Sequence, residues 1–537
     1  MDLGLGRVQA LLRRVGSPQT RFPVIHVAGT NGKGSTTAYL DALLTHAVGV
    51  RSARFNSPHL ITARDSVRVA GGEPVDERIW ALAEERTRRA DASAADGSAP
   101  IHATPFELLT VGALVAFSLL PPAQQPDVLL IEVGVGGRLD ATNVFPDDGV
   151  LASVICPIAR DHEALLGHGL AAITKEKAGI IKPHGLAVIA DQASGVSARH
   201  GVHAASASVM AVLQEACTAN HARVAYGRIP WHDMRWGPRA GDGGPDAAPP
   251  YATAGGTAPA LRAPAAFTLP LYDAAPAGTP PAGHVPLRVE GTLARISGCC
   301  TALQTLWSIA HDTAHRGADS ARAAQRQELR DRIRARLFTG DESGPRIQHA
   351  LRQMRWEGRC EWHTTGEAHT PLLLDGAHNE ASARALRTYL EKCFDAYADA
   401  AGAPVHVCIT WVLAFSQGKD AHGMLDVLLR DWPTQARSWT CRGHRVALTS
   451  FSTPVEGMPW VQPAPTAALQ RAVEERVPGG DWLVQHGCMR TFPTLQDALA
   501  WGAERPTGDD ALHVVVVGGS LYLVSDYYRH SARGQAR

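Results

Sequence analysis

Residues 24–40 read VIHVAGTNGKGSTTAYL, and this stretch decides how the first half of the chain folds. Residues 24–27 are mostly apolar or β-branched, as in a buried strand, and a helical run begins directly after the glycine-rich residues 28–35. Glycines let a backbone turn tightly and approach a phosphate group, and the N-terminus of a helix attracts anions. The order strand, glycine loop, helix therefore predicts a phosphate-binding loop in an α/β domain.

This loop departs from the usual P-loop spelling. Gly34 separates Lys33 from Ser35, whereas a hydroxyl residue normally follows the lysine directly, and Val27 stands where the first glycine is expected. Lys33 is predicted to reach the β- and γ-phosphates, and the Ser35 hydroxyl to take a place on Mg²⁺. A glycine-rich turn without a ligand is the alternative. The residues expected to hold ATP here are Gly29, Thr30, Asn31, Gly32, Lys33, Gly34 and Ser35.

The composition argues against several classes of protein. Lys plus Arg and Asp plus Glu both number 52, so no surface for nucleic acid or membranes is indicated. Apolar residues make up 45% of the 537 positions, which is enough for two domain cores, and no uncharged apolar run is long enough to span a bilayer. The nine cysteines lack CxxC spacing, which favours reduced core residues over a metal site. We therefore expect a soluble, cytoplasmic protein with small-molecule partners.

A second candidate residue ends a predicted strand. Residues 127–133 form a nearly continuous apolar run that contains Glu132, as in a strand buried in a parallel sheet. Ligands of open α/β sheets bind at the carboxyl ends of the strands. Because a carboxylate is a preferred Mg²⁺ ligand, Glu132 is predicted to bind the metal directly or through water.

The segment Thr104-Pro105-Phe106-Glu107 opens an apolar helix that runs to about Leu119. Glu107 lies in its first turn, where the helix dipole favours negative charge, so a capping carboxylate is one interpretation. A binding role is the other.

Three strings in this order resemble the folylpolyglutamate synthase and dihydrofolate synthase branch of the Mur ligase superfamily: GTNGKGS at 29–35, EVGVGGRLDATN at 132–143 and DGAHN at 375–379. The resemblance implies an α/β fold, with a P-loop Mur-ligase-like ATP-binding domain at 1–345 and a smaller Rossmann-like α/β domain at 346–537. A stretch rich in Gly, Pro and Ala at about 237–283 interrupts the first domain, and we interpret it as a loosely held insertion without chemistry.

The resemblance also implies roles for residues that the pattern alone does not identify. Ser57, in a Ser-Pro-His loop, corresponds to a serine on the Mg²⁺ of ATP, and His162 to a ligand of a second Mg²⁺. Lys177 corresponds to a lysine that is carbamylated and becomes an anionic metal ligand. The implied metal ligands are Ser35, Ser57, Glu132, His162 and Lys177, with Lys33, His162 and Lys177 as the catalytic residues.

Further residues are implied for the substrates. Ser297 takes the place of an asparagine that contacts ATP, Arg359 belongs to a Trp-Glu-Gly-Arg string where the family has Trp-Pro-Gly-Arg, and Asp375 maps to an ATP contact. The implied pterin-binding residues are Thr104, Phe106, Glu107, Leu139, Asp140 and Ala141.

The implied reaction is an ATP-dependent amide ligation. ATP phosphorylates the carboxylate of 7,8-dihydropteroate, and L-glutamate attacks the acyl phosphate. The short N-terminus and the pterin-pocket strings resemble the monofunctional dihydrofolate synthases of fungi most. A polyglutamating or bifunctional enzyme stays open, as does a non-catalytic ATP-binding homologue. The resemblance implies Mg²⁺ and leaves room for a monovalent cation. We expect a monomer. Residues 1–16 are amphipathic with three arginines, as in a transit peptide, which leaves a mitochondrial pool open, but they lack serines and contain Asp2. We therefore interpret them as the first helix of the folded domain.

Overall fold

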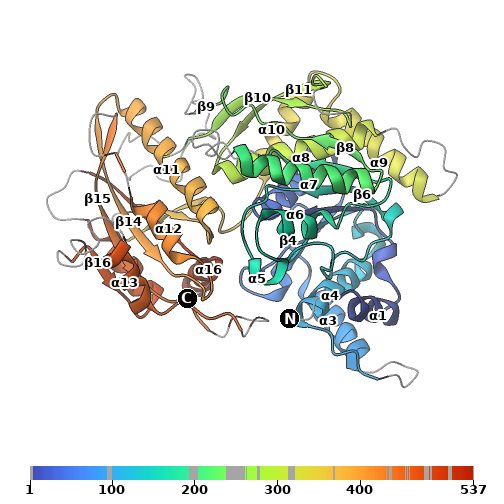
Figure 1. Ribbon diagram of the computed structural model, residues 1–537, viewed down its shortest axis with the longest axis horizontal. Coiled ribbons are helices and arrows are strands. Elements are labelled where there is room, and N and C mark those ends of the chain that lie inside the picture. Colours follow the sequence, from blue (N-terminus) through green and yellow to red (C-terminus); the bar gives the residue numbers. More distant parts are fainter. Residues whose placement is uncertain are drawn as a thin grey trace. The chain divides into compact units, whose positions relative to one another are not determined.

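The computed structural model describes residues 4–92, 99–192, 203–236, 261, 263–274, 279–312, 321–366, 369–430, 432–433, 438–453, 455, 458, 460–476, 483, 487–505 and 511–535. The chain forms two compact units, and the part of the second unit that follows residue 356 is orange to red in Figure 1. The first unit holds Met1–Met234, Ala266–Val289 and Ala294–Trp356, and the second holds Arg235–Ala265, Glu290–Leu293 and Glu357–Arg537. The predicted boundary at 345/346 falls within helix α10 (Ser343–Gln353) of the first unit.

A parallel sheet with an antiparallel edge forms the centre of the first unit. Among the described residues its eight strands have the order β4-β3-β2-β5-β1-β6-β7-β8. Strand β1 pairs in parallel with β5 on one side and β6 on the other, and it is buried along its whole length. The strands are β1 (Val24–Ala28), β2 (Ser52–Phe55), β3 (Val67–Val69), β4 (Glu73–Pro74), β5 (Val128–Glu132), β6 (Val150–Ile155), β7 (Leu186–Ile189) and β8 (Arg223–Tyr226).

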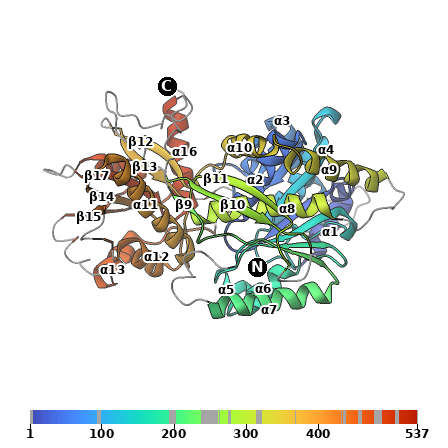
Figure 2. The same ribbon diagram turned by 90° about the horizontal axis from the view of Figure 1, so that it is seen from above.

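Helices cover both faces of this sheet. Alternate residues of β5, Leu129 and Ile131, pack into one core with α1 and α4, and α2 packs against the sheet outside that core. Helices α6 and α7 lie side by side over β7 (Figure 2). The helices are α1 (Gly6–Arg14), α2 (Lys33–Ala42), α3 (Glu77–Ala92), α4 (Pro105–Leu119), α5 (Glu163–Leu166), α6 (Leu170–Ala178), α7 (His203–Ala219), α8 (Leu293–His311), α9 (Ala321–Leu337) and α10.

Short helical turns complete the unit: η1 (Pro18–Thr20), η2 (Leu43–Val48), η3 (Ala63–Ser66), η4 (Pro122–Gln124) and η5 (Asp147–Gly149). The turn η2 has π-helical geometry and continues α2 directly.

The stretch 237–283 contains regular structure at its end, which the composition did not predict. Strand β10 (Ala265–Leu271) alternates buried and less buried residues, and it lies next to β11 (Gly283–Val289) in a small sheet. The expectation of a loosely held loop is therefore wrong for residues 265–271, where alternating apolar side chains pack inward. Residues 237–260, 262 and 275–278 lie outside the described residues.

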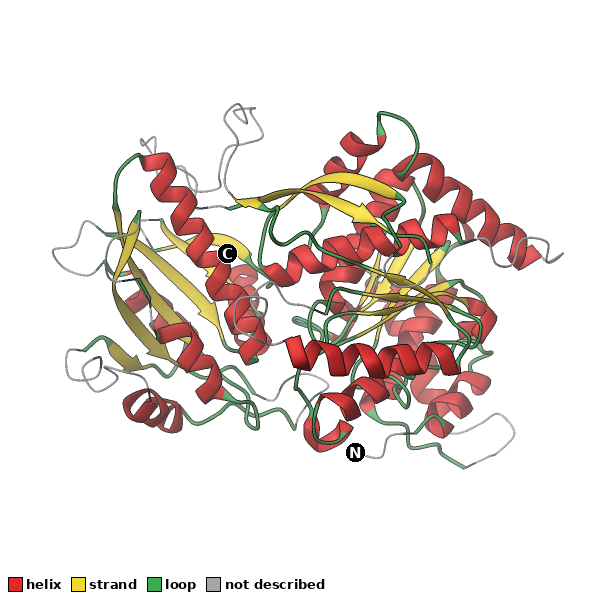
Figure 3. Ribbon diagram, turned by 45° about the horizontal axis from the view of Figure 1, so that its top comes forward, coloured by secondary structure: helices red, strands yellow, loops and turns green. Residues whose placement is uncertain are grey.

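The second unit is built around another parallel sheet. In the described ranges its six strands, which Figure 3 draws as yellow arrows, have the order β12-β13-β17-β14-β15-β16. Only β12 runs antiparallel to its neighbour. The strands of this unit are β9 (Arg235–Trp236), β12 (Glu361–Thr365), β13 (Thr370–Leu374), β14 (Val405–Leu413), β15 (Trp439–Leu448), β16 (Met489–Thr491) and β17 (Leu512–Gly518).

One face of this second sheet packs with α11, α12 and α13 in a single core, and Gly502 of α15 lies against Thr410, Val412 and Val515 on the other face. The alternation of parallel strands and helices confirms the predicted α/β class. No helix in the described ranges is both long and apolar enough to cross a membrane. The helices are α11 (Glu380–Ala401), α12 (Ala421–Leu429), α13 (Thr466–Arg476), α15 (Leu495–Ala503) and α16 (Leu521–Gln535).

Candidate active site

The glycine loop between β1 and α2 is fixed to the segment that leaves β6. Backbone N–H groups of Thr30 and Asn31 both donate to the carbonyl of Pro157, at 3.0 and 3.2 Å. The Thr30 hydroxyl donates to the carbonyl of Ala159 and accepts from its N–H, at 3.0 and 3.1 Å. Gly29 has a φ of 142°, and a Cβ there would come within 2.6 Å of Cβ of Cys156. The loop is therefore held in one shape by contacts that do not require a nucleotide.

Lys33, the first residue of α2, and Glu132, the last residue of β5, meet beside this loop. The Lys33 ammonium donates to the carbonyl of Thr30 at 3.1 Å and lies 3.8 Å from Oε1 of Glu132. Asn56 donates from Nδ2 to Oε2 of Glu132 at 2.8 Å and to the Thr37 hydroxyl at 2.7 Å. Glu132 and Asn56 are buried, so this carboxylate is held in a fixed orientation at the carboxyl end of its strand.

Lys177 approaches the loop from α6. Its ammonium is buried and donates to the carbonyl of Gly29 at 2.8 Å. Burial, reinforced by the positive charge of Lys33, lowers the pKa of Lys177 from 10.5 to about 7, and the carboxylate of Asp161 opposes this effect. A large fraction of Lys177 is consequently a neutral amine near neutral pH, and a neutral amine is a nucleophile.

Ser35 and Ser297 lie where α8 packs against the start of α2. A Cβ on Gly298 would come within 2.9 Å of Cβ of Ser35, so the two helices are in close contact there. Ser35 is buried on the α2 side, and the Ser297 hydroxyl is buried without a hydrogen-bond partner among the described residues. A buried hydroxyl without a partner is costly, so this group is available to hydrogen-bond a ligand.

The other two predicted metal ligands are more exposed. Ser57 is half-buried and directly follows Asn56. His162 is the N-cap of α5 with a φ of 56°, and 40% of its side chain is exposed. Its N–H donates to Oδ1 of Asp161 at 2.9 Å, and its Nε2 lies 3.8 Å from Oδ2 of the same residue. Asp161 thus connects His162 with the electrostatic surroundings of Lys177.

Thr104 and Glu107 form a capping box at the start of α4. The Glu107 N–H donates to the Thr104 hydroxyl at 3.2 Å, and the Thr104 N–H donates to Oε2 of Glu107 at 2.6 Å. Arg7 donates to the same carboxylate oxygen at 3.0 Å. The capping interpretation of Glu107 is confirmed. Phe106 lies against Gly134, where a Cβ would overlap Cζ of the ring and lie 2.8 Å from Cε1, so it borders the loop that leaves β5.

Asp140 organises that loop from inside. Its Oδ2 accepts from the N–H of Val135 at 2.9 Å, and its Oδ1 accepts from the N–H and the hydroxyl of Thr142 at 3.0 and 2.5 Å. Burial raises the pKa of Asp140. Leu139 is half-buried and Ala141 is buried beside it. The carboxylate of Asp140 therefore holds the shape of the segment 134–143, whether or not it also meets a substrate.

His26 of β1 extends this network. Its Nε2 is hydrogen-bonded to the Thr142 hydroxyl at 2.9 Å, and burial lowers its pKa from 6.5 to about 3, so the ring is neutral. Because that hydroxyl gives its hydrogen to Asp140, Nε2 of His26 must donate. The strand that carries the glycine loop and the segment 134–143 are thus joined by one buried chain of hydrogen bonds.

Arg359 and Asp375 belong to the second unit, which is described by itself. Asp375 follows β13, and its carboxylate accepts from the N–H groups of Cys360 and Ala377, both at 2.8 Å. Arg359 donates to the carbonyl of Gly376 at 2.9 Å. The structure brings these two predicted residues together at the carboxyl end of a parallel strand.

The donors around the glycine loop fit a divalent cation that arrives with phosphate. In the part of the chain that is described, no three His, Cys, Asp or Glu side chains gather closely enough to hold a metal ion. The hydroxyl of Ser35 and the carboxylate of Glu132 offer oxygen ligands instead. Mg²⁺ commonly takes one or two protein ligands and completes its shell with phosphate oxygens and water.

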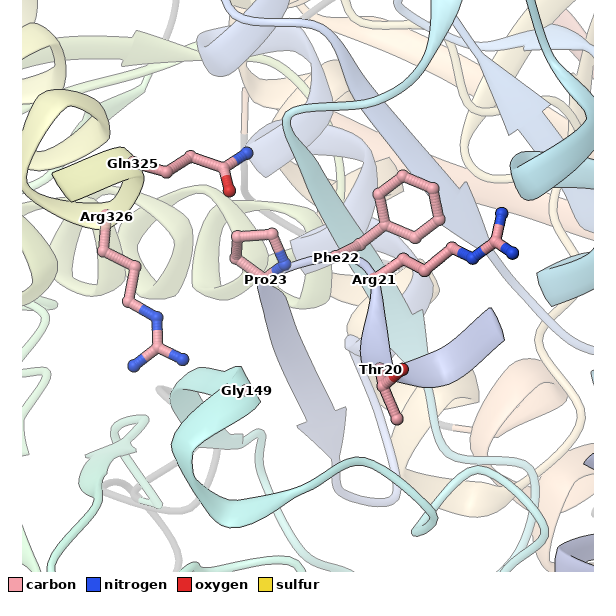
Figure 4. A pocket seen from close by; sticks show the side chains of 7 residues that line it. All are labelled: Thr20, Arg21, Phe22, Pro23, Gly149, Gln325 and Arg326. Atoms are coloured by element: carbon pink, nitrogen blue, oxygen red, sulfur yellow. The ribbon is translucent and has the colours of Figure 1, made fainter. Parts of the chain in front are cut away.

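A separate hollow lies at the other end of β1. Pro23, directly before this strand, and Arg326 are among its lining residues (Figure 4), and Arg326 is 3.7 Å from Asp148. Since the glycine loop leaves the opposite end of β1, this hollow is not part of the candidate site. Its lining residues are Thr20, Arg21, Phe22, Pro23, Gly149, Gln325 and Arg326.

Sequence reasoning missed three residues of the site. Asn56 orients Glu132, Asp161 acts on Lys177, and Cys156 packs against Gly29. Asn56 and Asp161 are direct neighbours of the predicted residues Ser57 and His162, so their positions held a signal. For Cys156, packing against a glycine far away in the sequence left none.

Known proteins similar to this chain are dihydrofolate synthetases, folylpolyglutamate synthases or enzymes described as both. A family described as the C-terminal domain of dihydrofolate synthetase matches residues 359–530. The chain is 25% identical to a probable dihydrofolate synthetase of Schizosaccharomyces pombe over 99% of this chain and 98% of the relative. It is 27% identical to the dihydrofolate synthetase of Saccharomyces cerevisiae, with 98% of both chains covered.

Two solved structures have the same fold. Folylpolyglutamate synthase of Mycobacterium tuberculosis, complexed with ADP and AMPPCP, superposes with a TM-score of 0.66 at 24% identity and covers 98% of this chain and 95% of its own. A bifunctional folylpolyglutamate and dihydrofolate synthase of Yersinia pestis, complexed with AMPPNP and a Mn ion, gives 0.61 at 21% identity, with 99% and 94% covered.

Proposed function

Because this chain belongs to the folylpolyglutamate synthase and dihydrofolate synthase family, we propose that it is a dihydrofolate synthase. It joins L-glutamate to 7,8-dihydropteroate with ATP. The observation that carries the proposal is the convergence of Lys33, Glu132 and Lys177 on one glycine loop, at the carboxyl end of a parallel sheet. The fungal dihydrofolate synthetases match this chain over nearly its whole length, which supports dihydropteroate over tetrahydrofolate monoglutamate as the substrate.

The chemistry proceeds through an acyl phosphate. A carboxylate oxygen of dihydropteroate attacks the γ-phosphorus of ATP, and ADP leaves. The neutral amino group of glutamate then attacks the acyl carbon and gives a proton to solvent, an amide bond forms, and phosphate departs with the electrons of the broken C–O bond. Phosphorylation is needed because an unactivated carboxylate would have to expel oxide or hydroxide, which are poor leaving groups.

The residues at the loop stabilise the charge of the transferring group. Lys33 holds its ammonium beside the first turn of α2, where the backbone N–H groups attract phosphate oxygens. Ser35, Ser57 and Glu132 would hold Mg²⁺, with Ser297 satisfied by the nucleotide. Bound there, Mg²⁺ supplies positive charge to the phosphate oxygens in the transition state. Arg359 and Asp375 are proposed as further ATP contacts.

We assign Lys177 and His162 to a second cation. The neutral Lys177 amine can add to CO₂, which forms a carbamate and releases a proton. The positive charge of Lys33 favours the anionic product, since the carbamate would replace a repulsion between Lys177 and Lys33 by an attraction. Phe106, Leu139 and Ala141 are proposed to border the pterin ring, while Thr104, Glu107 and Asp140 shape the backbone around it.

The test is phosphate release by the purified protein with Mg·ATP and L-glutamate, comparing 7,8-dihydropteroate with tetrahydrofolate monoglutamate. We expect turnover with dihydropteroate and none with tetrahydrofolate monoglutamate. When glutamate is omitted, phosphate release should not exceed one equivalent per site, which is the amount of acyl phosphate that can form. Turnover with tetrahydrofolate monoglutamate instead would replace the proposed function by polyglutamation. Phosphate release that needs neither pterin nor glutamate would contradict a ligase altogether.

A further inference from the structure

Trp356, the last residue of the first unit, packs directly on the nucleotide loop. Its indole ring covers Gly34, the residue that separates Lys33 from Ser35. A Cβ on Gly34 would overlap Cζ2 of the indole and would lie 3.1 Å from Cε2 and 3.3 Å from Cη2. The space that the missing side chain leaves is therefore filled by Trp356.

Steric room, and not backbone conformation, explains the glycine at position 34. Gly34 is the second residue of α2 and has the backbone of that helix, which every residue type can adopt. In a helix, glycine is less favourable than alanine because it loses more conformational freedom on folding. Gly34 in the sequence Gly-Lys-Gly-Ser thus makes the first turn of α2 less stable, and packing against Trp356 offsets this loss.

A buried ion pair also contacts the ring. The guanidinium carbon of Arg54 lies 4.9 Å from the centroid of the Trp356 ring, and Nη2 of Arg54 donates to the carbonyl of Arg355 at 3.3 Å. Nε of Arg54 lies 3.3 Å from Oδ2 of Asp41, and both side chains are buried. Asp41 belongs to α2, so Trp356 contacts both the first turn of this helix and an arginine that is anchored near its end.

We propose that Trp356 is a positioning residue for ATP, acting through Gly34 on the flanking Lys33 and Ser35. The inference rests on the proposed function, because it assigns a nucleotide to this loop. Without the ring, the first turn of α2 can shift toward the vacated space, and both phosphate-binding side chains move with it. The loop segment 29–31, in contrast, has its own anchors at Pro157 and Ala159.

The first measurement is the affinity for a non-hydrolysable Mg·ATP analogue by calorimetry, with the melting temperature of each variant recorded. Trp356→Ala is expected to weaken binding about tenfold, as for other residues that orient a ligand-binding group. Trp356→Phe should restore most of the affinity, because a phenyl ring still covers Gly34. The KM for dihydropteroate should change less than that for ATP.

A matched control exists in the same unit. Trp307 of α8 covers Gly283 in the same way, with Cη2 within 2.6 Å of a Cβ built there. Trp307→Ala should lower the melting temperature without changing nucleotide affinity. If both tryptophan variants lose stability and neither loses affinity, Trp356 is a packing residue only and the proposal is overturned.

A double-mutant cycle tests the contact itself. Gly34→Ala should weaken nucleotide binding in the wild-type background and should do so much less in the Trp356→Ala background, where the methyl group has room. Additive effects would overturn the proposal. Should Trp356→Ala fail to fold, the same cycle with Trp356→Leu decides. If the wild-type protein itself binds no Mg·ATP analogue, the proposed function is refuted instead. This result differs from every outcome that concerns only the variants.

Discussion

Nδ2 of Asn56 donates a hydrogen bond of 2.8 Å to Oε2 of Glu132, the carboxylate at the end of β5. The same amide group donates to Thr37 at 2.7 Å, so it ties α2 to the sheet at the point where a cation is proposed. Removing a group that orients a metal ligand typically costs about 10- to 100-fold in metal affinity or activity.

We therefore predict that Asn56→Ala lowers kcat about 10- to 100-fold. It should also reduce the free energy of unfolding by about 1–3 kcal/mol, because a buried carboxylate and a hydroxyl lose their donor. Steady-state kinetics and urea unfolding would measure both. Asn220→Ala, which removes an amide from the end of α7, is the control and should leave kcat unchanged. A normal kcat in Asn56→Ala would show that the orientation of Glu132 by Asn56 is not needed for catalysis.

Lys33→Ala should reduce turnover at least about 100-fold through loss of charge at the phosphates. The fold should persist, because the contacts of the ammonium within the described residues are the hydrogen bond to Thr30 and a 3.8 Å approach to Glu132. Circular dichroism would verify the fold. Lys175→Ala, exposed on α6, serves as the control. Near-normal turnover in Lys33→Ala would remove this lysine from the mechanism.

His162→Ala should likewise stop turnover and leave the protein folded, since this side chain is 40% exposed at the start of a short helix. His168→Ala, which removes another exposed histidine nearby, should have no effect. The comparison of phosphate release by the two variants decides, and equal rates would dismiss His162 as a ligand.

The lowered pKa of Lys177 has two consequences for pH dependence. The group is neutral in the folded protein above about pH 7, whereas it stays protonated in the unfolded chain up to 10.5. The unfolded state therefore binds more protons between these values, and in CO₂-free buffer the free energy of unfolding should rise with pH across this window. Lys177→Met should flatten that rise, as urea unfolding at pH 7 and pH 9 can show.

Activity should follow the same group. Below pH 7 Lys177 is increasingly an ammonium, which cannot add to CO₂, so turnover after CO₂ depletion should recover with bicarbonate faster at pH 8 than at pH 6. Intact-protein mass spectrometry should detect the added CO₂ in wild type only. Recovery of the same size in Lys177→Met would exclude carbamylation of this residue.

His26 should contribute to acid sensitivity. Its pKa is about 3 in the folded protein and 6.5 in the unfolded chain, so the stability that its neutral form allows is complete above pH 6.5 and is lost as the pH falls toward 3. His26→Gln keeps a donor for Thr142 but does not titrate. The free energy of unfolding of His26→Gln should therefore fall less than that of wild type as the pH is lowered from 6.5 to 4. An equal fall in both proteins would contradict a contribution of His26 to acid sensitivity.

Thr104→Ala separates a capping role from a substrate role. Loss of the cap should cost about 1 kcal/mol of stability, while the KM for dihydropteroate should change little. Glu107→Gln loses the charge that faces Arg7 but keeps one oxygen acceptor for the N–H of Thr104. Because this acceptor remains, the loss of stability should be smaller than in Thr104→Ala. A rise in the KM for dihydropteroate that is larger than the loss of stability can explain, in either variant, would instead put these side chains in contact with the pterin.

The sequence predicted those parts of the site whose signal is local. The strand, loop and helix around Lys33, the strand ending at Glu132 and the cap at Glu107 each follow from short patterns of glycine, apolar runs and capping residues, and the structure contains all three. The strand at 265–271 was missed because Gly, Pro and Ala dominated the surrounding composition. Strand β12 was missed as well, since its alternation of Trp362 with polar residues is short.

Tertiary relationships left no comparable signal. Asp140 reads as a substrate contact in the signature string, yet both of its oxygens accept hydrogen bonds from the loop, which only the folded backbone reveals. The pKa of Lys177 depends on burial and on Lys33, a residue on another element. The pairing of Asn56 with Glu132 joins two strands, and no spacing in the sequence encodes it.

The contact between Gly34 and Trp356 also bears on how these proteins change over time. Two positions that fill one space are not independent, so a substitution at either one alters the fitness effect of a substitution at the other. Relatives that carry a side chain at the position of Gly34 should have a smaller residue at that of Trp356. Any lineage that returned to the ordinary P-loop spelling would first have to give up this indole ring.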